Sequence, residues 1–116
     1  MLKKTYRVNN DFIITLNGQF DADTVNIIKD DIETYSKLSS NIIFDLENVI
    51  FIDSSGIGAI VFLYKRMAVK GFSVSITGLK EQPLELFQLL FLDKTINCYP
   101  NFDCYLESSQ NFKVAS

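Results

Sequence analysis

The feature that most limits how this chain can fold is an apolar stretch from Asn41 to Ile52 that stops at Asp53. Its first part, NIIFDL, is almost entirely apolar, which is typical of a strand covered on both faces. The second part, NVIFI, continues the run after an expected bend at Glu47 and Asn48. A strand of this kind predicts the interior of a layered domain that has helices on its faces.

A helical pattern follows this strand directly. Apolar residues between Ile57 and Ala68 recur at helical spacing, basic residues occupy the last turns, and Gly71 is the expected end signal. The DSSG sequence at positions 53–56 therefore lies where a buried strand passes into a helix of about four turns.

The N-terminal part of the chain shows two strands and a helix. Apolar residues alternate with mostly polar ones on either side of Asn9 to Asp11, which predicts two short strands around a turn. Gly18 stops the second strand, and Asp21 is the expected N-cap of a helix from Ala22 to about Leu38. Asp23 suits the positive first turn of that helix.

The C-terminal part continues the alternation of strands and helices. Strict alternation from Phe72 to Thr77 predicts a strand with one polar face, placed near an edge of the sheet. Pro83 is expected to start a helix, a short segment runs from Thr95 to Tyr99, and a last helix is expected from about Asn101 to Asn111. The residues expected to face inward from these two helices are Leu84, Phe87, Leu90, Phe91, Phe102, Tyr105 and Leu106.

This order of elements predicts an α/β fold in one domain spanning residues 1–116. We expect a single-layer, mixed and mostly parallel β-sheet with about four helices. Functional residues of such sheets gather outside the carboxyl ends of the strands. Asp53, Ser54 and Ser55 lie there, and so does the loop from Gly18 to Asp21 if its strand runs in the same sense.

Composition argues against several classes of function. The chain has no histidine, which removes Ser-His-Asp and Cys-His catalysis and disfavours a zinc or iron site. A net charge of -3 without a basic cluster argues against nucleic-acid binding. Cys98 and Cys104 fit no common metal pattern and are interpreted as reduced, structural thiols. No cofactor is expected.

No segment of the sequence predicts export or membrane insertion. The N-terminus has basic residues without an apolar core after them, unlike a signal peptide. The longest apolar run, Ile57 to Tyr64, is far shorter than the roughly 20 residues that a membrane span needs. We therefore expect a cytoplasmic protein that does not contact a membrane.

The simplest interpretation of the DSSG sequence is structural, with Asp53 or Ser54 capping the helix. It leaves unexplained the second hydroxyl and two glycines, Gly56 and Gly58, which each cost up to about 1 kcal/mol in a helix relative to alanine. A nucleophile elbow and the glycine-rich phosphate loops are disfavoured because their motifs are missing. A phospho-acceptor receiver domain, with Asp53 as acceptor, is disfavoured because the chain begins with two strands.

The remaining interpretation is a serine that becomes modified. A helix N-terminus presents a hydroxyl in an exposed loop and can tolerate a phosphate. Phosphorylation adds about -1.5 to -2 charges, here next to Asp53 and near Asp21. The modified face would then repel an acidic partner or block an apolar one.

Over about Asp11 to Tyr105, the chain resembles STAS-domain proteins, and specifically the anti-sigma factor antagonists. The resemblance lies in NIIFDLENVIFIDSSGIGAIVFLYKRMAVKG, preceded by LNGQFDADT and followed by FSVSITGLKEQPLELFQLLFLDKTINCYPN. DSSG at a strand–helix junction is its specific part, and the rest is general α/β patterning. Ile57 stands where family members often have leucine, and SSQNFKVAS at the C-terminal end has no clear counterpart.

The resemblance implies a regulatory protein and not an enzyme. Its unphosphorylated form would bind an anti-sigma factor that is also a serine protein kinase of the histidine-kinase-like ATPase fold. That kinase, which holds ATP and magnesium, would phosphorylate Ser54 and so end the complex, and a PP2C-type serine phosphatase would restore it. The residues that would complete the partner-binding loop are Asp21, Asp53, Ser55, Gly56 and Ile57.

A second hypothesis keeps the family without the switch. The chain would then be a STAS subunit of a lipid-transport complex or another signalling assembly, and the serine would act only as a cap or a contact. A kinase and a phosphatase encoded nearby would favour the first hypothesis, and a transporter ATPase the second. An enzyme in its own right has no sequence feature in its favour.

Overall fold

A five-stranded sheet forms the centre of the structure, a computed structural model that describes residues 2–115. The strands follow chain order across the sheet; β1 and β2 are antiparallel, and the other neighbours are parallel. The expected mixed, mostly parallel sheet is therefore confirmed. The strands are β1 (Leu2–Val8), β2 (Asp11–Phe20), β3 (Ile42–Ile52), β4 (Val74–Thr77) and β5 (Asn97–Tyr99).

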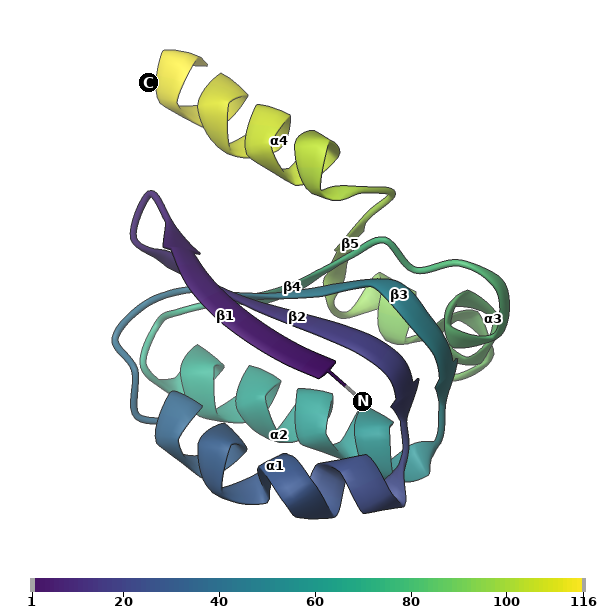
Figure 1. The fold of residues 1–116 in the computed structure, drawn as a ribbon. Helices are drawn as coiled ribbons and strands as arrows, with labels where there is room; N and C mark the ends of the chain where they lie inside the picture. Colours follow the sequence, from purple (N-terminus) through teal and green to yellow (C-terminus); the bar gives the residue numbers. More distant parts are fainter. Residues whose placement is uncertain (1, 116) are drawn as a thin grey trace.

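Helices lie on both faces of this sheet (Figure 1). α1 (Ala22–Tyr35) and α2 (Ser54–Val69) run side by side on one face, and α4 (Phe102–Ala115) lies over the other. α3 (Glu81–Leu89) lies beside the second half of β3, and the 3-10 turn η1 (Leu92–Lys94) leads on to β5. Within residues 2–115 there are four α-helices, as expected.

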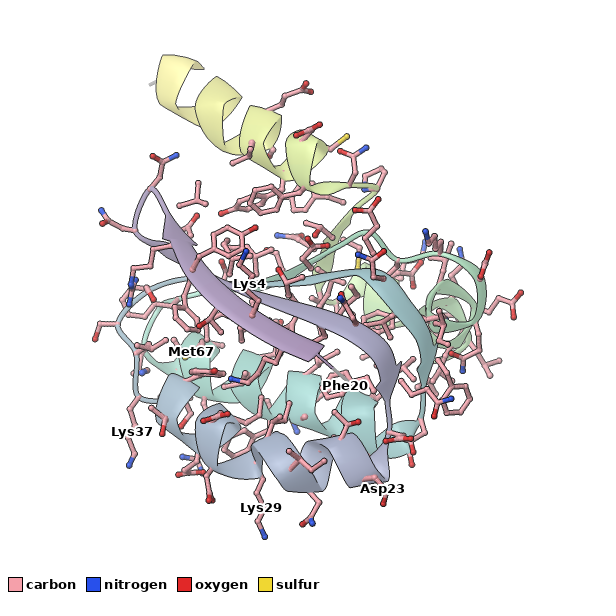
Figure 2. The ribbon with its side chains drawn as sticks, viewed as in Figure 1. Lys4, Phe20, Asp23, Lys29, Lys37 and Met67 are labelled. Carbon is pink, nitrogen blue, oxygen red and sulfur yellow. The ribbon has the colours of Figure 1, made fainter. Side chains whose placement is uncertain are left out.

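The main core lies between the sheet and the layer of α1 and α2. Figure 2 shows Phe20 and Met67 in this layer, and both side chains are fully buried. Burying one large apolar side chain stabilises a fold by about 1.5–3 kcal/mol, so this layer holds α2 firmly against β2 and β3. Other fully buried members of the cluster are Ile14, Leu16, Phe44, Leu46, Ile52, Ile60 and Leu63.

The signals at the helix ends agree with the sequence, although two boundaries move. Asp21 is the N-cap of α1, and Gly71 follows α2 with a positive φ of 86°. α1 ends at Tyr35, before the predicted Leu38, while α4 continues past the predicted Asn111.

The sequence predicts that β4 has one polar face and lies near an edge of the sheet, and the structure differs from this prediction. Ser75 and Thr77 are buried, and β5 separates β4 from the edge of the sheet. The Thr77 hydroxyl donates to Asp45 Oδ1 at 3.4 Å. Alternation shows which side chains share a face, but it does not show whether another element covers that face.

α3 begins at Glu81, so Pro83 lies within its first turn, where a missing N–H group needs no partner. Pro83 and Phe87 are buried, whereas Leu90 and Phe91 follow the helix and are 47% and 70% exposed. The prediction that Leu90 and Phe91 face inward is therefore wrong. The chain leaves the helix at this point, because Phe91 has a left-handed backbone with φ of 58°.

Candidate functional site

The loops that follow β2 and β3 meet at one edge of the sheet. The two strands are parallel neighbours, and their pairing ends with Phe20 opposite Ile52. The Asp53 N–H group donates to the Phe20 carbonyl oxygen at 3.4 Å. The prediction that Gly18 stops this strand is wrong, because β2 continues through Gly18 to Phe20. The end of β2 and Asp21 nevertheless meet the DSSG sequence at this edge, as expected.

The Asp53 carboxylate caps two helices at once. Its Oδ1 atom accepts hydrogen bonds from the N–H groups of Ser55 at 2.9 Å and Gly56 at 3.1 Å, in the first turn of α2. Its Oδ2 atom accepts from the N–H group of Ala22, at the start of α1, at 3.2 Å. A negative charge is favourable beside both helix N-termini, so Asp53 ties the starts of α1 and α2 together.

Asp21 stands at the start of α1, next to this arrangement. Its Oδ1 atom accepts from the N–H group of Thr24 at 3.1 Å, and its side chain is half-buried. Asp23 follows it in the first turn of α1 and is exposed. The edge of the sheet therefore carries three carboxylates around the start of α2 and α1, and it is acidic.

The two serines of the DSSG sequence differ in exposure. Ser54 is the first residue of α2 and is exposed, and its hydroxyl has no hydrogen-bond partner among the residues that the structure describes. Ser55 is half-buried, and its N–H group is bonded to Asp53. Ser54 is therefore the hydroxyl of this loop that another protein can reach most easily.

Gly56 and Ile57 lie beneath the loop and are both buried. A Cβ atom at Gly56 would lie 2.3 Å from the Phe20 carbonyl oxygen, so only glycine lets α2 approach β2 this closely. The predicted site residues thus divide into the exposed Ser54, the half-buried Ser55, two carboxylates that cap the helices, and two buried residues beneath the loop.

Two β-bulges in β3 change the exposure of residues next to the loop. Leu46 and Glu47 together oppose a single residue of β2, and Ile50 is an extra residue between the pairs Gly18–Val49 and Gln19–Phe51. The second bulge reverses the alternation, so that Ile50 and Phe51 are 63% and 41% exposed. The sequence predicts one continuous buried run here, because alternation of hydrophobicity cannot show a bulge.

Gln82 of α3 also belongs to the site, and the sequence analysis missed it. Its side-chain amide forms two hydrogen bonds with the backbone of Ile52, directly before Asp53. No local pattern marks this residue, because its partner is far away in the sequence and comes close only when α3 packs beside β3.

Among the side chains that the structure describes, no group is suited to hold a metal ion, and no helix within residues 2–115 is long and apolar enough to cross a membrane. Both cysteines are free thiols. Burial, and then the nearby charge of Asp93, raise the pKa of the Cys98 thiol to about 11. This thiol is therefore protonated at neutral pH.

The sequence matches the STAS domain over residues 3–104, and the chain belongs to the STAS domain family. It is 23% identical over 88 residues to the anti-sigma-B factor antagonist of Bacillus subtilis (strain 168), which covers 76% of this chain and 81% of that protein. The family expected from the DSSG region is therefore confirmed.

Many solved structures are similar to this fold, and two of them serve as examples. The crystal structure of an anti-sigma factor antagonist from Mycobacterium paratuberculosis has a TM-score of 0.83 at 20% identity, over 92% of each chain. The phosphorylated form of the Bacillus cell fate determinant SpoIIAA has a TM-score of 0.67 at 21% identity, over 84% of this chain and 90% of that one. Both confirm the STAS fold.

Proposed function

We propose that this protein is an anti-sigma factor antagonist that binds a serine protein kinase and is released when Ser54 is phosphorylated. The observation that carries the proposal is the exposed Ser54 hydroxyl at the start of α2, in a loop that Asp53 holds from both sides. The partner is an anti-sigma factor with the histidine-kinase-like ATPase fold. A PP2C-type serine phosphatase reverses the modification.

The reaction transfers one phosphoryl group to this chain. The Ser54 Oγ atom attacks the γ-phosphorus of ATP on the kinase, so that a new O–P bond forms while the bond to the ADP oxygen breaks. The hydroxyl proton passes to a base on the kinase. The phosphatase removes the group by hydrolysis: water attacks the phosphorus of phosphoserine, the bond between phosphorus and Ser54 Oγ breaks, the Oγ atom regains a proton, and inorganic phosphate leaves. This chain contributes the acceptor and its position.

The added phosphate stays on the surface of the loop. Asp53 already accepts the N–H groups of Ser55 and Gly56, so the phosphate cannot take these donors without displacing the carboxylate. Two unit charges 4 Å apart repel by about 4 kcal/mol at an effective dielectric constant near 20. Phosphorylation is therefore expected to add charge and bulk to the docking face without refolding the loop.

Exposed apolar side chains that closely precede Ser54 in the sequence support a protein partner. Ile50 and Phe51 lie on β3 just before the loop, and both present apolar surface to solvent. A partner that covers them gains about 25 cal/mol for each Å² of apolar surface removed from water. A phosphate beside this surface would have to lose hydration in the complex, which opposes binding.

The test begins with a pull-down from the native cell, with wild-type protein and Ser54→Asp as bait. The captured kinase is then incubated with the purified protein and Mg-ATP, and the phosphate is located by mass spectrometry. We expect one phosphate, on Ser54. Ser54→Ala should bind the kinase and remain unmodified, and Ser54→Asp should bind at least about tenfold more weakly, which corresponds to 1.4 kcal/mol.

Ser55→Ala is the matched control, since it removes the neighbouring hydroxyl and leaves Ser54 in place. It should be phosphorylated and released like the wild type. Phosphate on Ser55 alone would contradict the proposal. Equal binding of wild type and Ser54→Asp, with no phosphate on either serine, would favour a STAS subunit without a switch.

A further inference from the structure

The side of β3 that faces β4 is paired with another strand along only part of its length. β4 pairs with β3 from Ile42 to Asp45, so in the described part of the chain no strand lies beside the last residues of β3 on the side away from β2. Gln82 of α3 takes that place at Ile52. Its Nε2 atom donates to the Ile52 carbonyl oxygen, and its Oε1 atom accepts from the Ile52 N–H group, both at 2.9 Å.

These bonds hold the peptide plane that enters the acceptor loop. The Ile52 carbonyl and the Asp53 N–H group belong to one planar unit. Gln82 binds its carbonyl, and the Phe20 carbonyl oxygen accepts its N–H group at 3.4 Å. Rotation of this plane would move the Asp53 carboxylate, which organises the first turn of α2, and Ser54 would move with it.

α3 is a firm support for this contact. The residue after Gln82, Pro83, is buried, and Phe87 one turn further is fully buried in the core cluster. The proline ring also restricts the backbone that carries Gln82. The amide is therefore presented to Ile52 by a packed helix and not by a mobile loop.

We propose that Gln82 is the positioning residue of the phospho-acceptor loop. By holding the peptide between Ile52 and Asp53, its side-chain amide fixes where the Ser54 hydroxyl stands for phosphoryl transfer. The inference rests on the proposed function of Ser54. Because a displacement of about 1 Å can slow a reaction about 100-fold, loss of the two hydrogen bonds that hold the peptide before Asp53 is expected to slow phosphoryl transfer to Ser54.

The first arm of the test measures the order of the phospho-acceptor loop in the absence of a kinase. Gln82→Met has a similar length but no hydrogen-bonding amide, and Gln88→Met makes the same change on the exposed side of α3. Amide hydrogen exchange is followed by NMR. In Gln82→Met we expect about tenfold lower protection at Ile52, Ser55 and Gly56, with no change in the middle of α2.

Unchanged protection at Ser55 and Gly56 in Gln82→Met would overturn the proposal, because the loop would then keep its order without the amide. Gln88→Met should exchange like the wild type. If Gln82→Met does not fold, Gln82→Glu replaces it: the carboxylate keeps an acceptor for the Ile52 N–H group and loses the donor to the Ile52 carbonyl.

The second arm measures phosphoryl transfer with the kinase captured by the wild-type protein. In single-turnover reactions at saturating kinase, Gln82→Met should be phosphorylated about 10- to 100-fold more slowly, while its Kd for the kinase stays within about twofold of the wild type. An unchanged rate would overturn the proposal. If wild-type Ser54 is not phosphorylated, the proposed function fails, and the exchange measurement still decides whether Gln82 orders the loop.

Discussion

Gly56 offers the sharpest test of how closely α2 is packed against β2. A Cβ atom at this position would lie 2.3 Å from the Phe20 carbonyl oxygen and 2.8 Å from Ile52 Cγ1. Ordinary contacts between carbon atoms are about 3.5–4.0 Å, so Gly56→Ala must shift the first turn of α2 by about 1 Å. The carbonyl belongs to the backbone at the end of β2 and has little freedom to move aside.

Gly58, in the same helix, supplies the matched control, because a Cβ atom there meets nothing within 4 Å. Alanine in place of a helical glycine stabilises by up to about 1 kcal/mol, and both variants gain this term. Only Gly56→Ala adds the overpacking cost of about 1–3 kcal/mol. The free energy of unfolding of Gly56→Ala should therefore be lower than that of Gly58→Ala by about 1–3 kcal/mol.

Urea denaturation followed by far-UV circular dichroism measures this difference. Gly58→Ala should unfold at a higher urea concentration than the wild type, and Gly56→Ala at a lower concentration than Gly58→Ala. In a phosphorylation assay, Gly56→Ala should also be the slower of the two, since Ser54 lies on the turn that shifts. Equal unfolding midpoints for the two variants would refute the close approach of α2 to Phe20.

Two further predictions concern Asp53 and Cys98. Asp53→Ala removes the acceptor for three backbone N–H groups at the starts of α1 and α2, so it should lower the free energy of unfolding by about 1–2 kcal/mol, and an unchanged urea midpoint would contradict this. Because burial and Asp93 raise the pKa of Cys98 to about 11, its thiol should react with iodoacetamide at pH 7 more slowly than in the urea-unfolded chain, and an equal rate would count against its burial. The unfolded thiol has a pKa near 9, so the protonated form favours folding: this contribution is complete below about pH 9 and is lost as the pH rises toward 11, and Cys98→Ser should lack that fall in the urea midpoint.

Local signals were sufficient for the elements and for the place of the loop. An apolar strand, an acidic N-cap and a helical repeat are each visible within a few neighbouring residues, and they locate Asp21, Asp53 and Ser54 correctly at the strand–helix junctions. Local signals failed where burial depends on a second element. Ser75 is buried although it is polar, and Phe91 is exposed although it is apolar. Neither fact can be derived from the residue and its sequence neighbours, because each depends on whether another element covers the residue.

By itself, the sequence determined an α/β fold with a serine at a helix start, because backbone propensity, capping and hydrophobic periodicity act over short distances along the chain. Only the tertiary structure decided that Asp53 also caps α1, that bulges expose Ile50 and Phe51, and that Gln82 holds Ile52. The residue type limits the hydrogen bonds that a side chain can form. Which partner lies within 3 Å of it depends on how distant segments pack, and this is settled only when the whole core forms.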